Sequence, residues 1–91
     1  MANIGQFKVG KEWQKLDDVT GYEYVADDSY TIQNKGYDPL QLIIAPSKPE
    51  TTKIGFVIQQ KEKVGYTCEE GNFLWVRAYD KVTEFNIAEG V

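Results

Sequence analysis

Short apolar runs separated by turn-forming residues are the feature that most constrains the fold of this chain. The runs recur every 8–12 residues, roughly, and are rich in β-branched and aromatic side chains. No stretch has the i, i+3, i+4, i+7 apolar spacing of an amphipathic helix, so we expect no helix longer than about two turns. The pattern predicts an all-β protein: a single small antiparallel β-sandwich, jelly-roll-like, with about six to eight short strands. The expected strand runs are 13–17, 22–26, 30–34, 40–45, 56–60, 64–68, 73–79 and 82–87.

The chain divides into an N-terminal segment and one domain. Its 91 residues suit a single domain of ordinary small size. Residues 1–12 contain the apolar Ile4, Phe7 and Val9, so this segment is more apolar than a solvated tail. We interpret it as an N-terminal docking arm, which packs either on its own domain or on a neighbour, followed by one β-sandwich domain at 13–91. Deletion of most of the arm is then expected to leave the sandwich folded.

Alternation along the predicted strands indicates which side chains form the core. Successive residues of a strand point to opposite faces, so large apolar residues at every second position mark the buried face. The residues expected in the core on this basis are Leu42, Ile44, Phe56, Ile58, Leu74, Val76 and Phe85. The short Asp80-Lys81 connection also predicts that the runs 73–79 and 82–87 pair as a tight hairpin.

The second face of the 73–79 run is also largely apolar. Phe73, Trp75 and Tyr79 share this face with Arg77, whereas a solvated strand face normally carries polar residues. We therefore expect either that this strand is central, or that the face is covered by a loop, by the N-terminal arm or by another subunit. The candidates for a protein–protein interface are Ile4, Phe7, Val9, Phe73, Trp75 and Tyr79.

Composition argues against catalysis and against a metal or cofactor site. The chain has no histidine and one cysteine, which excludes an imidazole base, a histidine–metal site and an internal disulfide. The thiol of Cys68 precedes Glu69-Glu70, and neighbouring acids oppose thiolate formation. The other acid pairs, Asp17-Asp18 and Asp27-Asp28, are adjacent in sequence, so their side chains diverge instead of facing each other across a cleft as in a glycosidase. We expect no enzyme activity, no cofactor and no bound metal.

The charge balance argues against nucleic acid as a partner. Fourteen acidic and ten basic residues give a net charge of −4, and an acidic surface repels phosphate. An oligonucleotide-binding barrel fits the size and strand number, but this charge disfavours it. No apolar run approaches the roughly 20 residues that a membrane-spanning helix requires, and the N-terminus lacks the apolar segment of a signal peptide. We therefore expect neither nucleic acid nor membrane as a partner.

A series of short motifs runs from Tyr30 to the last strand. The series comprises the segment Tyr30-Thr-Ile-Gln-Asn-Lys-Gly36, Pro39 before an apolar run, the Pro46/Pro49 loop, and Gly71-Asn-Phe-Leu-Trp-Val-Arg-Ala78 before a short closing strand. In this order the motifs resemble the small virion β-sandwich proteins of tailed bacteriophages. The resemblance covers about residues 30–89.

The resemblance implies a non-enzymatic structural protein of a bacteriophage virion, either a capsid decoration protein or a head or tail accessory protein. It also implies symmetric protein–protein docking, because such proteins are usually homo-oligomers; a trimer is favoured. The implied partners are further copies of this chain and other phage virion proteins. The implied location is the phage particle, after synthesis in the bacterial cytoplasm.

The aromatic content leaves a second function open. The chain has two tryptophans, six tyrosines and four phenylalanines. Aromatic side chains exposed in a row could stack on sugar rings, as in a carbohydrate- or host-receptor-binding β-sandwich module, although such residues more commonly build cores and interfaces. The candidates for such a shelf are Trp13, Tyr22, Tyr24, Tyr30 and Tyr37.

Overall fold

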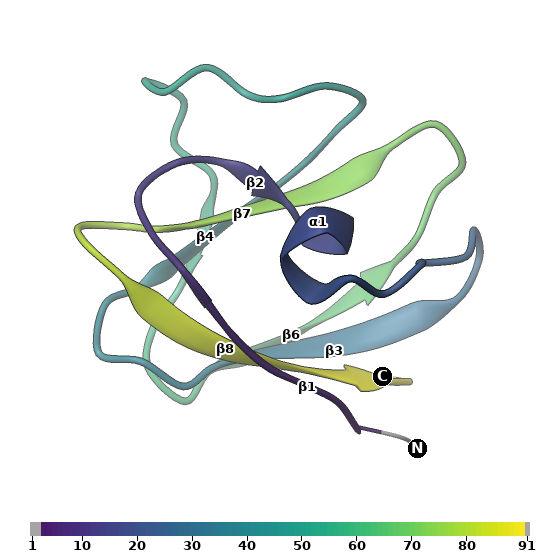
Figure 1. Cartoon of the computed structure of the whole chain (residues 1–91), viewed down its shortest axis with the longest axis horizontal. Coiled ribbons are helices and arrows are strands. Elements are labelled where there is room, and N and C mark those ends of the chain that lie inside the picture. Colours follow the sequence, from purple (N-terminus) through teal and green to yellow (C-terminus); the bar gives the residue numbers. More distant parts are fainter. Residues whose placement is uncertain (1–2, 91) are drawn as a thin grey trace.

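Eight β-strands and one short helix form the part of the chain described by the computed structural model, residues 3–90 (Figure 1). Met1, Ala2 and Val91 lie outside the described residues. The strands are β1 (Asn3–Val9), β2 (Gln14–Lys15), β3 (Ser29–Asn34), β4 (Leu40–Ala45), β5 (Phe56–Ile58), β6 (Lys63–Thr67), β7 (Phe73–Ala78) and β8 (Thr83–Glu89). The helix α1 (Leu16–Thr20) ends at Gly21, whose φ of 68° is favourable for glycine. No helix among residues 3–90 is long and apolar enough to cross a membrane.

The strands form two antiparallel sheets of four strands each. Sheet A has the order β1-β8-β3-β6, and sheet B has the order β2-β7-β4-β5. The first four strands therefore pair with the last four in reverse order: β1 with β8, β2 with β7, β3 with β6, and β4 with β5. This is the winding of an eight-stranded jelly roll, in which one long antiparallel ribbon wraps around a core. The predicted fold class, a small antiparallel β-sandwich of jelly-roll type, is confirmed.

The core lies between the two sheets. In β3 and β8 every second residue is buried, as expected for strands with one face on the core. The helix α1 closes one side of the sandwich beside β1, β2 and β7, with Leu16 fully buried (Figure 1). The rings of Tyr22, Tyr24 and Tyr30 pack together, with centroids between 4.8 and 6.0 Å apart.

Five of the seven residues predicted for the core are buried. These five are Leu42, Ile58, Leu74, Val76 and Phe85. The prediction is wrong for Ile44 and Phe56, whose exposed fractions are 50% and 62%. The strands β5 and β6 are the last strands of their sheets, so no further strand covers the inner face at this margin. Alternation identifies the face of a strand, but it does not tell how far the opposite sheet extends.

The predicted hairpin between the last two strands is wrong. β7 pairs with β2 and β4, whereas β8 pairs with β1 and β3. The connection at Asp80-Lys81 therefore crosses from sheet B to sheet A. The carboxylate of Asp38 stabilises this crossing, because it accepts hydrogen bonds from the backbone N–H groups of Asp80 at 2.9 Å and Lys81 at 2.7 Å.

The described part of the predicted docking arm is a strand of the sandwich. Asn3–Val9 pairs with β8, from Asn3 opposite Ala88 to Val9 opposite Thr83. Val9 is 2% exposed, and the ring of Phe7 packs on that of Phe85 with centroids 6.0 Å apart. The sequence left open whether this segment packs on its own domain or on a neighbour. It packs on its own domain, where it is an edge strand of sheet A and not a separate arm.

Candidate functional site

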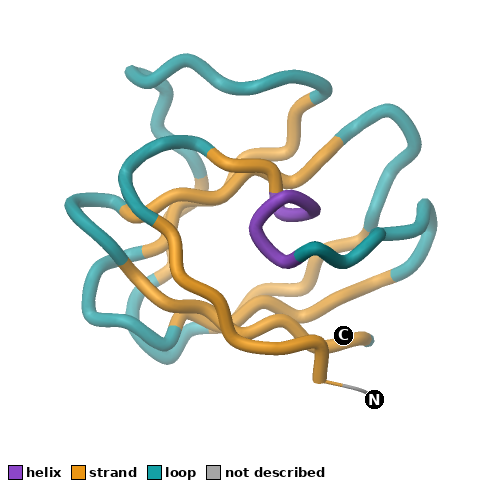
Figure 2. Tube along the Cα trace, viewed as in Figure 1, coloured by secondary structure: helices purple, strands orange, loops and turns teal. Residues whose placement is uncertain are grey.

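The outer face of sheet B is covered by the chain's own loop, residues 46–55. Arg77 on this face donates hydrogen bonds to the carbonyl oxygens of Thr51 at 2.8 Å and Lys53 at 2.6 Å. Trp75 donates to the carbonyl oxygen of Ala45 at 3.1 Å and is buried. The loop arches beyond the end of the strands it connects (Figure 2). The loop, and not the N-terminal segment, therefore covers this face around Arg77.

The six interface candidates do not come together on one surface. Three of them lie on β1 of sheet A and pack against the core: Ile4, Phe7 and Val9. In sheet B, Phe73 is half-buried with the Lys15 Nζ 4.0 Å from its ring centroid, and Trp75 is buried. Tyr79 is 49% exposed. Their interface role stays a prediction.

The aromatic shelf, which the sequence left open as an alternative, does not form a continuous surface, because four of its five candidates are buried or pack against the core. Trp13 and Tyr30 are at most 2% exposed, and Tyr22 and Tyr24 pack against the core. Tyr37 differs from all of them, with an exposed fraction of 91%.

Three large exposed apolar side chains, from β4, from β5 and from the loop before β5, line one cleft together. Ile44, Ile54 and Phe56 are 50%, 69% and 62% exposed. We call these three residues the β4–β5 patch. The alternation pattern predicted that Ile44 and Phe56 are buried, so it did not indicate this exposed patch. One residue could have indicated the patch from the sequence. Ile54 is a large apolar residue in the 46–55 loop, where no strand buries it.

Clefts flank the β4–β5 patch on two sides. One, of about 320 Å³, is lined almost wholly by apolar side chains from β4, β5, β6 and β7: Leu42, Ile44, Phe56, Val64, Tyr66 and Leu74, together with Gly65. The other, of about 600 Å³, lies along the 46–55 loop and includes the charged Lys48, Glu50 and Lys53. Ile44 and Phe56 line both clefts, so the patch is a ridge between an apolar hollow and a charged one.

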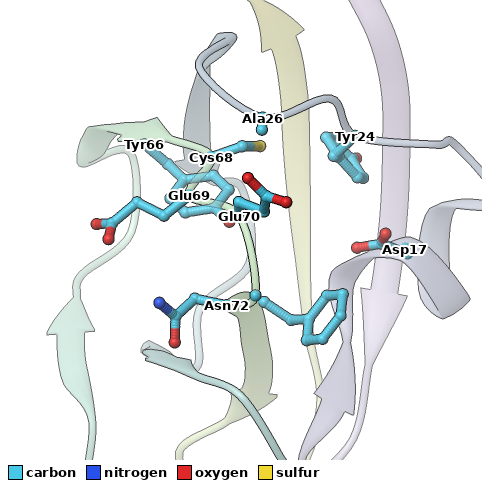
Figure 3. A pocket seen from close by; sticks show the side chains of 10 residues that line it. Asp17, Tyr24, Ala26, Tyr66, Cys68, Glu69, Glu70 and Asn72 are labelled. Atoms are coloured by element: carbon cyan, nitrogen blue, oxygen red, sulfur yellow. The ribbon is translucent and has the colours of Figure 1, made fainter.

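A third pocket, of about 160 Å³, gathers acidic groups around the free thiol at one end of the sandwich (Figure 3). In Figure 3 the Glu70 carboxylate points toward Asp17 and Tyr24, whereas Glu69 extends to the opposite side. Burial raises the pKa of the Asp17 carboxyl and of the Cys68 thiol, and it raises the pKa of Tyr24 to about 12.

These shifts decide what the pocket can do chemically. The Cys68 thiol stays protonated at neutral pH, so the pocket offers no thiolate nucleophile. Among residues 3–90, no three His, Cys, Asp or Glu side chains are grouped so that they could hold a metal ion. The carboxylate, amide and phenol groups that line the pocket can accept or donate hydrogen bonds.

The fold and its surfaces define a jelly-roll β-sandwich with an exposed apolar patch. A comparison of the chain with protein-family models, with curated proteins and with solved structures finds no match.

Proposed function

We propose that this protein is a non-enzymatic structural protein that acts by symmetric protein–protein docking, as a capsid decoration protein or a head or tail accessory protein of a bacteriophage virion. The observation that carries the docking proposal is the β4–β5 patch. Three large apolar side chains, each at least half exposed, stand together at the margin of the sandwich. Contiguous exposed apolar surface on a small domain marks an interaction site.

The composition of the patch supports a protein partner. An aromatic and two aliphatic side chains form its centre, and charged side chains of the 46–55 loop lie beside them. This arrangement, apolar in the middle and charged at the rim, is typical of protein–protein interfaces. Burial of the half or more of each side chain that is still exposed contributes about 1–2 kcal/mol before the cost of association is subtracted.

The partner that we propose for the patch is a second copy of this chain. Lys48 and Lys53 lie along the patch, whereas the whole chain has a net charge of −4. Another copy therefore presents acidic surface that complements the lysines. A contact between two different surfaces of the same chain closes into a ring when the rotation between copies is a whole fraction of a turn, and the resemblance to phage proteins favours a ring of three.

The virion assignment rests on that resemblance and on an analogy of fold. Jelly rolls are a common architecture of viral capsid proteins, but they also occur in lectins.

Light scattering coupled to size-exclusion chromatography tests the docking proposal. We expect a mass that is a multiple of 10.4 kDa and rises with concentration. Phe56→Ser should shift the mass toward the monomer, and Val25→Ser, at a side chain of similar exposure outside the patch, should not. A wild-type protein that stays at the monomer mass up to millimolar concentration would contradict the proposal. Mass spectrometry of purified phage particles from a host that carries this gene tests the virion assignment, which fails if the protein is absent from them.

A further inference from the structure

We infer that a cleft beside Tyr37, at the end of the sandwich formed by the β3–β4 and β7–β8 loops, binds a neutral saccharide. The cleft has a volume of about 500 Å³, in the range of small-molecule sites. Tyr37 stands at its edge with 91% of its surface exposed. The other side chains that matter here are Lys8, Pro39, Asp80, Lys81 and Val82.

The loop that carries Tyr37 is held by a buried asparagine. Asn34 is fully buried, and its amide Nδ2 donates hydrogen bonds to the carbonyl oxygens of Asp38 at 3.0 Å and Ile58 at 3.1 Å. Its Oδ1 accepts hydrogen bonds from the N–H of Gly36 at 3.0 Å and from the Thr83 hydroxyl at 2.9 Å. One side chain therefore connects the loop to β5 and β8.

The two walls of the cleft are fixed to each other. The Asp38 carboxylate accepts hydrogen bonds from the backbone N–H groups of Asp80 and Lys81. These bonds join the β3–β4 loop to the β7–β8 loop. Gly36 lies so close to β8 that a Cβ at this position would be 2.8 Å from the backbone nitrogen of Glu84. A site whose walls are already ordered loses little conformational entropy when a ligand binds. The loop that carries Tyr37 is thus held in place, and it presents the exposed ring at a fixed position.

The groups around Tyr37 fit a sugar better than a protein surface. An aromatic ring offers a face on which the C–H groups of a pyranose can stack, and the apolar Pro39 and Val82 extend that surface. Charged side chains that can hydrogen-bond hydroxyls line the same cleft. The centre of a protein interface is depleted in charged residues, and the apolar patch of this molecule lies elsewhere, on β4 and β5.

The charges of the cleft indicate a neutral ligand. Lys8 and Lys81 line the cleft together with Asp38, Asp80 and Glu84, and the Asp38 carboxylate already accepts hydrogen bonds from two backbone N–H groups. Positive and negative groups are therefore nearly balanced, so neither a phosphate nor an ammonium group is specifically attracted.

Amide chemical shifts in a ¹⁵N-labelled sample test the inference. The probes are cellobiose, maltose, lactose, N,N′-diacetylchitobiose and the anionic 3′-sialyllactose, each up to about 10 mM, because weak sugar sites have millimolar dissociation constants. We expect at least one neutral probe to shift the resonances of residues 36–37 and 80–84. Tyr37→Ala should weaken that binding roughly tenfold or more, Tyr37→Trp should retain it, and Tyr79→Ala, at an exposed tyrosine outside the cleft, should leave it unchanged.

Three outcomes would overturn the inference. The first is the absence of shifts in these residues with every probe, and the second is equal binding by Tyr37→Ala. The third is tighter binding of 3′-sialyllactose than of lactose. Loss of oligomer mass in Tyr37→Ala, without any saccharide binding by the wild type, would identify Tyr37 as a protein contact instead. The titration does not depend on the mass measurement with Phe56→Ser, so the saccharide site and the docking proposal can fail separately.

Discussion

The guanidinium carbon of Arg77 lies 4.3 Å from the ring centroid of Trp13, and the same guanidinium donates hydrogen bonds to two carbonyl oxygens of the 46–55 loop. The Trp13 indole N–H donates to a third, that of Glu50, at 3.2 Å. A cation over an aromatic face, both buried, contributes more than an exposed pair. Arg77 and Trp13 together therefore hold the loop on the outer face of sheet B.

Replacement of Arg77 by methionine is expected to lower the free energy of unfolding by about 3 kcal/mol, because hydrogen bonds that involve a charged group contribute about 1.5–3 kcal/mol each and some packing is retained. Urea unfolding measures the change, and limited proteolysis should show cleavage within residues 46–55. Arg77→Lys keeps the charge without the planar donor geometry, so it should be intermediate. Equal stability of the wild type and Arg77→Met would show that the loop is held by other contacts.

The buried Asn34 should be among the most sensitive polar positions. Its side chain makes four hydrogen bonds, to Gly36, Asp38, Ile58 and Thr83. Asn34→Ala is expected to cost about 3 kcal/mol in urea unfolding, because several buried partners lose their hydrogen bonds together. Thr83→Val removes one of the four and should cost about 1 kcal/mol. The proposed role of the network is wrong if both variants unfold at the urea concentration of the wild type.

Two phenylalanines on predicted core positions should respond very differently to truncation. Phe85 is fully buried, whereas Phe56 is 62% exposed. Phe85→Ala is expected to lower the free energy of unfolding by about 3–5 kcal/mol, and Phe56→Ala by less than about 1 kcal/mol. Thermal unfolding followed by circular dichroism compares the two directly. Similar losses for both variants would mean that Phe56 is buried in solution, for example in an oligomer, which a repeat of the measurement at low protein concentration distinguishes.

The contribution of Asp17 to the free energy of unfolding should increase as the pH falls. Burial raises the pKa of this carboxyl above its ordinary value of 3.8, so the folded state binds the proton more tightly than the unfolded state does. The resulting stabilisation is complete below pH 3.8 and is lost as the pH rises through the raised pKa of the folded state. Asp17→Asn should therefore raise the melting temperature at pH 7 relative to the wild type.

The difference between Asp17→Asn and the wild type should disappear below the ordinary pKa of aspartate, where both side chains are neutral. Asp18→Asn removes the same charge from an exposed neighbour and controls for the change in net charge. A pH-independent difference for Asp17→Asn would show that burial does not affect the ionisation of Asp17.

Deletion of residues 1–10 is expected to unfold or strongly destabilise the protein, in contrast to the expectation from the sequence. The deletion removes β1, leaves the backbone edge of β8 unpaired and uncovers Phe85, on which Phe7 packs. Circular dichroism and thermal unfolding of the truncated chain measure the effect. A truncated protein with the melting temperature of the full chain would show that these residues contribute as a removable arm after all.

Which strands pair, and which strand ends stay exposed, could be learned only from the tertiary structure. A short connection suits a hairpin, yet here residues 79–82 link two sheets, because β8 pairs with β1 and β3. Pairing depends on contacts between residues far apart in the chain, such as Phe7 with Phe85, which a local pattern does not contain. For the same reason the arm became an edge strand.

The sequence by itself determined that this chain is a β-sandwich, and it identified five buried residues in β4, β5, β7 and β8. The alternation of apolar residues reflects the two-residue repeat of a strand, which is a local property of the backbone. Only the tertiary structure decided that Ile44 and Phe56 stay exposed, that Arg77 is covered by a loop, and that Tyr37 projects beside a cleft. Burial depends on what lies across from a side chain, and that neighbour is chosen by the jelly-roll winding and not by the residues adjacent in sequence.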